Sequence, residues 1–330
     1  MQNRHIILKQ RPDGLPRLTD FALEDSPIRA LEEGEFLVAN SFIGLQPAAR
    51  IRMGTGDSYA APTPLGTPPY GQTVGRVVQS RHPGFAEGDH VALEGAWESH
   101  TISKGEKAWA FDPQIAPESY WLGCLGVSGM TGYVGVKEIL KAQAGETIVI
   151  SAATGAVGHV AGQIAKAIGC RVIGVAGGAE KCAAAVTEFG YDICVDHRDP
   201  AFAERLAEAC PDGIDLDFEN VGGPVRDAVW RLMNPFGRIA ICGLISEYNA
   251  EGAVSGPSWQ LALARRLTVR GFLLRDHLEL RPDFIAEVSD LLAKGAFRTR
   301  ETITDGIEKA PSAFIDMLQG RNFGKALVRV

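Results

Sequence analysis

The chain has 330 residues, of which 45% are hydrophobic and 22% charged, and its formal net charge is −7. This length exceeds the roughly 100 to 200 residues of a typical domain, so two domains are expected. The acidic balance provides no broad basic face for a phosphate backbone, which excludes nucleic acid as an expected partner, and no apolar run reaches the roughly 20 residues of a membrane span.

The first part of the chain, to about residue 120, is rich in short strand candidates. Among them are EFLVAN, TVGRVVQS, DHVAL and SHTIS, which are separated by turns rich in Pro, Gly and Asp. This pattern predicts a β-rich domain. The N-terminal MQNRHIILKQRPDG lacks the apolar core of a secretory signal, so a cytoplasmic protein is expected.

From about residue 146, short apolar strands alternate with amphipathic helices. The strand candidates are TIVIS, CRVIGVA, YDICVDH, IDLDFEN, GRIAICG and LTVRGFLL. This alternation predicts an α/β fold with a doubly wound parallel sheet. The final GKALVRV has strand composition and follows a helix-like segment, so it could return to the first domain.

The segment ATGAVG, from Ala153 to Gly158, occupies the position of a G-x-G-x-x-G fingerprint, with alanine in place of the first glycine. It follows a predicted strand and opens a helix, which is the context of dinucleotide binding. Gly155 would let the backbone approach a pyrophosphate, and the helix that begins after Ala156, near Val157, would direct free N–H groups at the phosphates. A tight structural turn is the alternative.

The end of the second strand indicates which dinucleotide binds. VAGGAEK places Gly177 and Gly178 where an acid would bind the adenosine ribose, and Lys181, with Arg198 after the third strand, could face a ribose phosphate. This favours NADP over NAD. Glu180 suits a helix start better than a ribose contact, and Lys181 could equally be a solvated surface lysine.

The cysteines and histidines show no metal-binding spacing. The six cysteines form no C-x-x-C pair, and the seven histidines form no H-E-x-x-H motif. Reduced thiols and no metal site are therefore expected.

Five motifs together resemble the medium-chain dehydrogenase/reductase superfamily, and specifically its zinc-free leukotriene/prostaglandin reductase and alkenal/one oxidoreductase branch. They are GVSGMTGYVGV, AATGAVGHVAGQIAKAIGCRVIGVAGGAEK, DFENVGG, FGRIAICGLISEYN and GRNFGKALVRV, so the resemblance covers nearly the whole chain. It implies a GroES-like catalytic domain from residues 1–122 and 297–330, a Rossmann NADP-binding domain from residues 123–296, and a homodimer.

The resemblance also implies an enzyme, an NADP-dependent oxidoreductase that acts on carbon–carbon double bonds. A hydride passes from NADPH to the β-carbon of an α,β-unsaturated ketone or aldehyde, and the enolate is then protonated. Tyr248 of ISEYN matches the catalytic proton donor, although it could instead be a loop aromatic at the domain interface. Zinc-dependent relatives carry a Cys and a G-H-E motif in the first domain, whereas here YGQTVG stands in that region and no cysteine precedes Cys124.

Other residues are placed against the cofactor by the same resemblance. They are Asn220, Cys242, Phe272, Leu273, Leu274, Asn322 and Thr131, for which turn, strand-cap, buried-thiol, core-packing and helix-cap roles are the structural alternatives. His197 replaces the tyrosine that relatives carry beside the ribose phosphate, so cofactor preference could vary with pH.

A second departure from the family lies near the expected substrate pocket. LQPAARIRM stands where the family usually has D-P-Y-M-R, so Gln46 and Ala48 replace an acid and an aromatic, and the substrate could differ. Arg50 and Arg52 persist, and surface salt bridges explain them as well as substrate binding does.

Three other functions stay open on the sequence. A quinone reductase of the same superfamily would use the same NADPH site, and a non-enzymatic NADPH-binding sensor would keep the site without turnover. A methyltransferase would also use a glycine turn. Tyr248 counts against the sensor, and Lys181 with the paired glycines counts against the methyltransferase.

Overall fold

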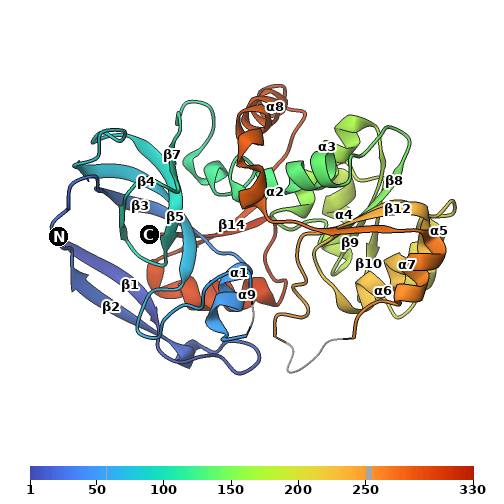
Figure 1. The fold of residues 1–330 in the computed structure, drawn as a ribbon, viewed down its shortest axis with the longest axis horizontal. Helices are drawn as coiled ribbons and strands as arrows, with labels where there is room; N and C mark the ends of the chain where they lie inside the picture. Colours follow the sequence, from blue (N-terminus) through green and yellow to red (C-terminus); the bar gives the residue numbers. More distant parts are fainter. Residues whose placement is uncertain (57, 250–254) are drawn as a thin grey trace. The chain divides into compact units, whose positions relative to one another are not determined.

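The computed structural model describes residues 1–56, 58–249 and 255–330 (Figure 1). The chain forms two compact units: Met1–Gly126 with Glu301–Val330, and Val127–Arg300. The first is β-rich and the second contains a parallel sheet with helices, so the predicted α/β class is confirmed. No helix in the described ranges is long and apolar enough to cross a membrane.

The first unit is built on a sheet with the strand order β14-β15-β3-β4-β5-β7, with β6 paired to β3, and on a separate β1-β2 ribbon. Its strands are β1 (Gln2–Leu8), β2 (Phe21–Pro27), β3 (Phe36–Gly44), β4 (Tyr70–Ser80), β5 (His90–Ala96), β6 (His100–Ser103), β7 (Ala108–Ala110), β14 (Glu301–Asp305) and β15 (Lys325–Arg329). Its α-helices are α1 (Ala48–Met53) and α9 (Ala310–Leu318).

The two chain ends share the core of this unit. β15 pairs antiparallel with β3, with Leu327 opposite Gly44. Fully buried Trp97 stacks on Phe21 at a ring-centroid distance of 5.6 Å and meets Phe314 of α9 edge-on at 5.1 Å. Aromatic pairs in these arrangements stabilise a core beyond the area that they bury.

The second unit is a doubly wound sheet whose paired strands are parallel, in the order β10-β9-β8-β11-β12-β13. Its strands are β8 (Thr147–Ser151), β9 (Arg171–Ala176), β10 (Ile193–Asp196), β11 (Ile214–Glu219), β12 (Met233–Ile241) and β13 (Thr268–Gly271). This order is that of the Rossmann fold, with its switch point between β8 and β11.

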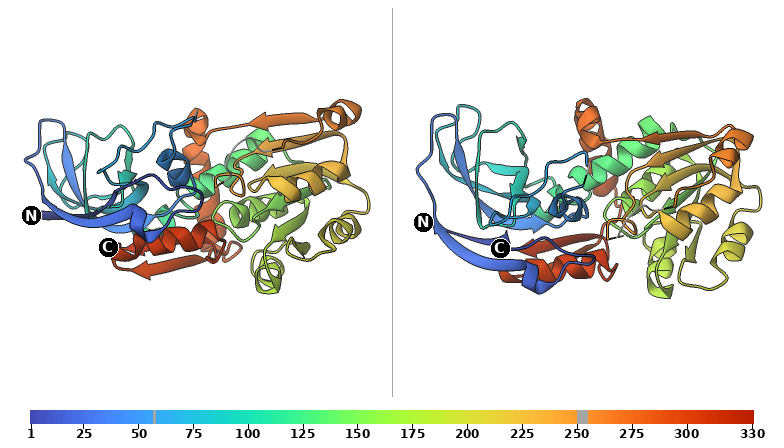
Figure 2. Two further views of the ribbon diagram at one scale, coloured as in Figure 1. Left: turned by 90° about the horizontal axis from the view of Figure 1, so that it is seen from below. Right: turned by 60° about the horizontal axis from the view of Figure 1, so that its bottom comes forward.

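Helices cover both faces of this sheet (Figure 2). The helices of this unit are α2 (Val127–Val134), α3 (Gly158–Ile168), α4 (Ala179–Thr187), α5 (Phe202–Ala209), α6 (Gly223–Leu232), α7 (Trp259–Arg265) and α8 (Arg281–Ala293), of which α8 packs against α2 and not on the sheet. In α3 the buried residues Val160, Ala161, Ile164 and Ala165 recur at helical spacing. Gly169 ends the helix in the left-handed region at φ +99°.

Candidate functional site

The turn between β8 and α3 requires its last glycine. A Cβ on Gly158 would lie 2.3 Å from the carbonyl oxygen of Ala152, and one on Gly155 would lie 3.1 Å from the same oxygen. Ala152 has φ +51°, so the left-handed residue of the turn precedes Ala153. Alanine at the first fingerprint position is therefore compatible with the turn.

His159, which the sequence did not single out, holds this turn from the helix side. Its fully buried ring places Nδ1 2.7 Å from the carbonyl oxygen of Gly155 and Nε2 3.1 Å from Oγ1 of Thr299. Burial lowers the pKa of His159 to about 4, so the ring is neutral at pH 7. Because a carbonyl only accepts, Nδ1–H donates to Gly155 and Nε2 accepts from the threonine hydroxyl.

Tyr191 holds the same turn from the sheet side. Its hydroxyl donates to the carbonyl oxygen of Gly158 at 2.7 Å. Its ring lies against Gly162, where a Cβ would come within 2.3 Å of ring carbons. No side chain caps the N-terminus of α3 in the described part of the chain. The helix start after Ala156 and Val157 is therefore fixed and open to an anion.

Two basic side chains cover the Gly177–Gly178 turn that follows β9. A Cβ on Gly177 would lie 2.9 Å from Nε2 of His197 and 3.0 Å from Nε of Arg198. Oδ1 of Asp196 accepts from the backbone N–H groups of Gly178 and Arg198, both at 2.9 Å. The end of β10 is thereby tied to the start of α4.

Lys181 lies in the first turn of α4 and completes what we call the basic cluster, with His197 and Arg198. Burial and the charge of Arg198 lower the pKa of Lys181, and the same two causes lower the pKa of His197. The positive charges of Lys181 and Arg198 repel each other, so an anion placed between them would be stabilised. Glu180 lies in the same helical turn, as predicted.

Asn220 joins the ends of β8 and β11 at the switch point. Its side-chain Nδ2 donates to the carbonyl oxygen of Ser151 at 2.8 Å, and its backbone N–H donates to Ser151 Oγ at 2.7 Å. Ser151 Oγ in turn donates to Oε1 of buried Glu219 at 2.7 Å. Asn220 is therefore locked at the point where the strand order reverses.

Tyr248 lies on the loop after β12, and its hydroxyl is held by the backbone. Oη accepts a hydrogen bond from the N–H of Leu244 at 3.1 Å. The preceding Glu247 pairs with Arg226 of α6 at 2.8 Å, and their side chains are only 14% and 8% exposed. This buried pair fastens the loop to α6 and so positions Tyr248.

The other predicted residues of this unit also follow strand ends. Cys242 comes directly after β12, and burial followed by the charge of Glu219 raises the pKa of its thiol to about 12. Phe272, Leu273 and Leu274 come directly after β13 and are half-buried. Because the carboxyl ends of parallel strands share one edge of a sheet, these residues, Tyr248, Asn220, the basic cluster and the glycine turn all lie along that edge.

Two predicted cofactor contacts lie elsewhere. The hydroxyl of Thr131 donates to the carbonyl oxygen of Val127 in its own helix at 2.7 Å, so it does not cap that helix. Asn322 belongs to the first unit, where its Nδ2 donates to the carbonyl oxygen of Gly324 at 2.9 Å.

In the first unit, Gln46 and Ala48 lie at the start of α1. Arg50 is buried and donates to the carbonyl oxygen of Gly14 at 2.8 Å. The guanidinium of Arg52 lies over the Tyr70 ring, 4.2 Å from its centroid. Arg50 therefore contacts a backbone carbonyl and Arg52 an aromatic face, and a substrate contact of either arginine stays a prediction.

The described residues contain no group of three or more His, Cys, Asp or Glu side chains that could hold a metal ion. None of the six cysteines forms a disulfide in this structure.

Two family models match the chain. One, described as the N-terminal domain of oxidoreductase, matches residues 4–111, and the other, described as zinc-binding dehydrogenase, matches residues 156–294. An NADPH-dependent curcumin reductase of Escherichia coli (strain K12) is 42% identical over 335 aligned residues, which span 100% of this chain and 97% of the relative.

Two further comparisons also span nearly the whole chain. Prostaglandin reductase 1 of Mus musculus is 37% identical and covers 100% of this chain and 99% of its own. The crystal structure of CurA from Vibrio vulnificus in complex with NADPH matches with a TM-score of 0.95 at 42% identity, covering 99% of both chains.

Proposed function

The chain belongs to the medium-chain dehydrogenase/reductase superfamily, in its zinc-free prostaglandin and alkenal reductase branch, and on this premise we propose its reaction. The protein is an NADPH-dependent oxidoreductase that reduces the carbon–carbon double bond of α,β-unsaturated ketones and aldehydes. One observation carries this proposal: each of the strands β8 to β13 ends directly before residues suited to the cofactor or the proton transfer. The first unit corresponds to the GroES-like domain and the second unit to the NADP-binding domain.

The residues present fit a phosphorylated dinucleotide. Gly155 and Gly158 place no side chain on the turn, and no side chain caps the N-terminus of α3 in the described residues, so its first N–H groups can face a pyrophosphate. Lys181, His197 and Arg198 surround a turn without a ribose-binding acid, which suits a 2′-phosphate. When bound there, NADPH supplies the hydride that reaches the β-carbon of the substrate.

Tyr248 handles the charge that appears on the substrate. As the β-carbon gains a hydride, negative charge develops on the carbonyl oxygen, and a phenol hydroxyl can donate to that oxygen. The N–H of Leu244 donates to Tyr248 Oη and stabilises negative charge on it as the proton moves away. A proton from water then adds to the α-carbon while the substrate oxygen returns its proton to Tyr248, which completes the reduction.

The Tyr248 assignment is tested by Tyr248→Phe. Because general acid catalysis contributes about 10²- to 10⁴-fold, kcat should fall by a factor in that range while NADPH affinity stays within about twofold. Full activity in the variant would end the assignment.

The reaction itself is tested by NADPH oxidation against enones, enals, curcumin and quinones, with NADH in parallel. Curcumin is included because a relative at 42% identity is a curcumin reductase. We expect turnover of enones with NADPH preferred. Preference for quinones would instead support the quinone reductase, and NADPH binding without any turnover would support the sensor.

Zinc independence is supported by the sequence of the first unit. No cysteine precedes Cys124, and YGQTVG occupies the region of the G-H-E motif. Activity should therefore survive prolonged treatment with a chelator. Loss of activity that only added zinc restores would contradict this part of the proposal.

A cytoplasmic homodimer is supported by one end of the parallel sheet and by the free thiols. β13 is the last strand in the order among the described residues, and Trp259 and Leu263 of the preceding α7 are 73% and 78% exposed. An exposed strand edge beside apolar side chains suits pairing with a second copy. Light scattering should give twice the chain mass, and Leu263→Glu should reduce it to one; a monomeric parent would refute the dimer. Fractionation of cells tests the compartment.

A further inference from the structure

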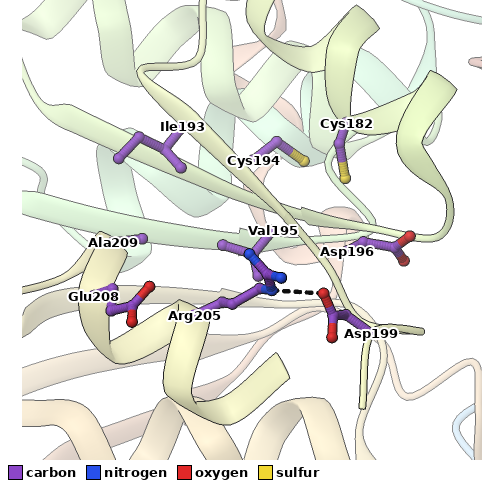
Figure 3. Close-up of a pocket in the computed structure, with 9 residues that line it drawn as sticks. All are labelled: Cys182, Ile193, Cys194, Val195, Asp196, Asp199, Arg205, Glu208 and Ala209. Carbon is purple, nitrogen blue, oxygen red and sulfur yellow. Dashed lines mark ion pairs between the residues drawn. The ribbon is translucent and has the colours of Figure 1, made fainter. Parts of the chain in front are cut away.

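Two cysteines lie against each other next to the basic cluster. Cys182 is in the first turn of α4 and Cys194 is in β10, and the thiol of Cys194 donates a hydrogen bond to the sulfur of Cys182. Figure 3 shows the two sulfur atoms side by side in a cavity of about 390 Å³ that Asp196 and Arg205 also line. Both cysteines are partly exposed, so a small oxidant can reach them.

The backbone of β9 makes room for the two sulfurs. Cys194 pairs in register with Gly174, where a Cβ would lie 3.1 Å from the cysteine sulfur. A side chain at that position would push the sulfur away. Both thiols lie close to the backbone of Ala176, and Ala176 immediately precedes the Gly177–Gly178 turn. The thiol pair therefore lies at the ends of β9 and β10, next to the basic cluster.

The two thiols have different reactivities. The hydrogen bond from Cys194 and the backbone of Ala176 lower the pKa of Cys182, and the N-terminus of α4 favours its thiolate further. The same hydrogen bond and burial raise the pKa of Cys194. Among the other cysteines, burial raises the pKa to about 11 for Cys170, about 11 for Cys210 and about 12 for Cys242, and Cys124 is fully buried. Cys182 is the nucleophile of the set.

We propose that Cys182 and Cys194 form a redox-sensitive pair that a hydroperoxide converts into a disulfide, which weakens NADPH binding at the adjacent basic cluster. The second half of this statement rests on the proposed cofactor site. The first half concerns the thiols alone and does not depend on the reaction that the enzyme catalyses.

The chemistry needs only hydrogen peroxide as oxidant. The Cys182 thiolate attacks one peroxide oxygen, the O–O bond breaks, and hydroxide leaves and takes up a proton, which gives a sulfenic acid on Cys182. The Cys194 sulfur then attacks that sulfur, the S–S bond forms, and the hydroxyl leaves as water with the Cys194 proton. The two thiols lose two electrons and two protons, and one peroxide becomes two waters.

The disulfide would affect NADPH binding because it shortens the distance between α4 and β10. A disulfide holds its sulfurs about 2.05 Å apart, well inside a thiol hydrogen bond. Cys182 adjoins Lys181, and its N–H donates to the carbonyl oxygen of Gly178. Cys194 lies two residues before Asp196, which holds the N–H groups of Gly178 and Arg198. Drawing the sulfurs together therefore displaces Lys181 from its partners in the basic cluster.

Peptide mapping tests the thiols directly. Trypsin releases residues 182–198 as one peptide, because no Lys or Arg lies between Lys181 and Arg198. After mild peroxide treatment and alkylation, we expect this peptide to carry no alkyl group and to be two hydrogens lighter. When a second protease cuts it after Glu188, the two halves should stay joined by the disulfide. Cys182 in a higher oxidation state beside alkylated Cys194, or peroxide reacting first at another cysteine, would overturn the pairing.

NADPH binding, followed by calorimetry without substrate, tests the second half. The oxidised protein should bind NADPH about tenfold more weakly, as for the loss of a charged hydrogen bond, with a smaller change for NADH and full recovery in dithiothreitol. Cys194→Ala should show no peroxide effect on affinity, and Cys210→Ala is the matched control that keeps it. A disulfide with unchanged NADPH affinity would overturn the coupling. Absence of NADPH binding in the reduced protein would overturn the cofactor site instead, while peptide mapping still decides the pair.

Discussion

The pH dependence of stability tests how His159 holds the glycine turn. The ring is fully buried and its pKa is lowered to about 4, whereas an unfolded histidine titrates near 6.5. Between these values the unfolded chain takes up a proton that the native protein does not. The free energy of unfolding therefore falls as pH falls through this window and is unaffected above it. At pH 4.5 the loss from this one group is about 2.5 kcal/mol.

The assay compares urea unfolding of the parent and His159→Gln from pH 7.5 to pH 4.5. Glutamine keeps an N–H that can donate toward Gly155 but does not titrate, so at pH 7.5 the variant should be about 1 kcal/mol less stable. Towards pH 4.5 the difference should shrink and reverse, because only the parent carries the cost of charging His159. Other buried ionisable groups, such as Asp217 and Lys325, occur in both proteins and cancel in the difference.

A control and a second readout make this test decisive. Val186→Ala changes an exposed side chain that does not titrate and should leave the difference nearly constant with pH. In His159→Gln, NADPH and NADH should both bind more weakly, because the turn and not the basic cluster is loosened. A parent–variant difference that stays constant from pH 7.5 to 4.5 would refute the neutral, buried state of His159.

Two further predictions concern the cofactor site. Lys181→Ala should weaken NADPH binding by about 10- to 100-fold, the value of a charged hydrogen bond, and change NADH binding less than about twofold in calorimetry. Equal losses for both cofactors would remove the phosphate role, and Lys294→Ala, directly after α8, is the matched control. Gly158→Ala places a Cβ 2.3 Å from the Ala152 carbonyl oxygen and should lower stability by about 1 to 3 kcal/mol and weaken both cofactors alike. Gly56→Ala, where a Cβ meets nothing within 4 Å, should do neither.

The sequence was most informative about the second unit. Parallel strands buried on both faces are nearly continuous apolar runs, so TIVIS and CRVIGVA were recognisable as β8 and β9 without knowledge of their partners. The glycine turn was recognisable for the same reason, since Gly158 excludes a side chain by contact with its own local backbone. Features that local geometry decides can be read from local sequence.

The residues that the sequence did not reveal act across the fold. His159 and Tyr191 bind carbonyl groups of the glycine turn, and a backbone carbonyl leaves no trace in the sequence. Arg226 and Glu247 are separated by 21 positions and pair only because α6 and the loop after β12 meet. A histidine directly after the final glycine of the fingerprint was the one available signal. Its burial, which decides its role, depends on tertiary packing.

The net charge of the chain disfavours anion binding, whereas the local charge at the cofactor site favours it, and the local charge decides what this site binds. A chain with a formal charge of −7 repels a polyanion at long range. The Gly177–Gly178 turn, however, is surrounded by Lys181, His197 and Arg198, and glycines stand where an acid would bind the ribose. Burial and the charge of Arg198 lower the pKa values of the other two groups. The fold thus holds Lys181 and Arg198 close together against the repulsion of their charges, which costs stability until an anion lies between them. Side chains placed at a cost in stability are typical of a binding site. A small group of positive charges at one turn suits a single phosphate better than a polyanion.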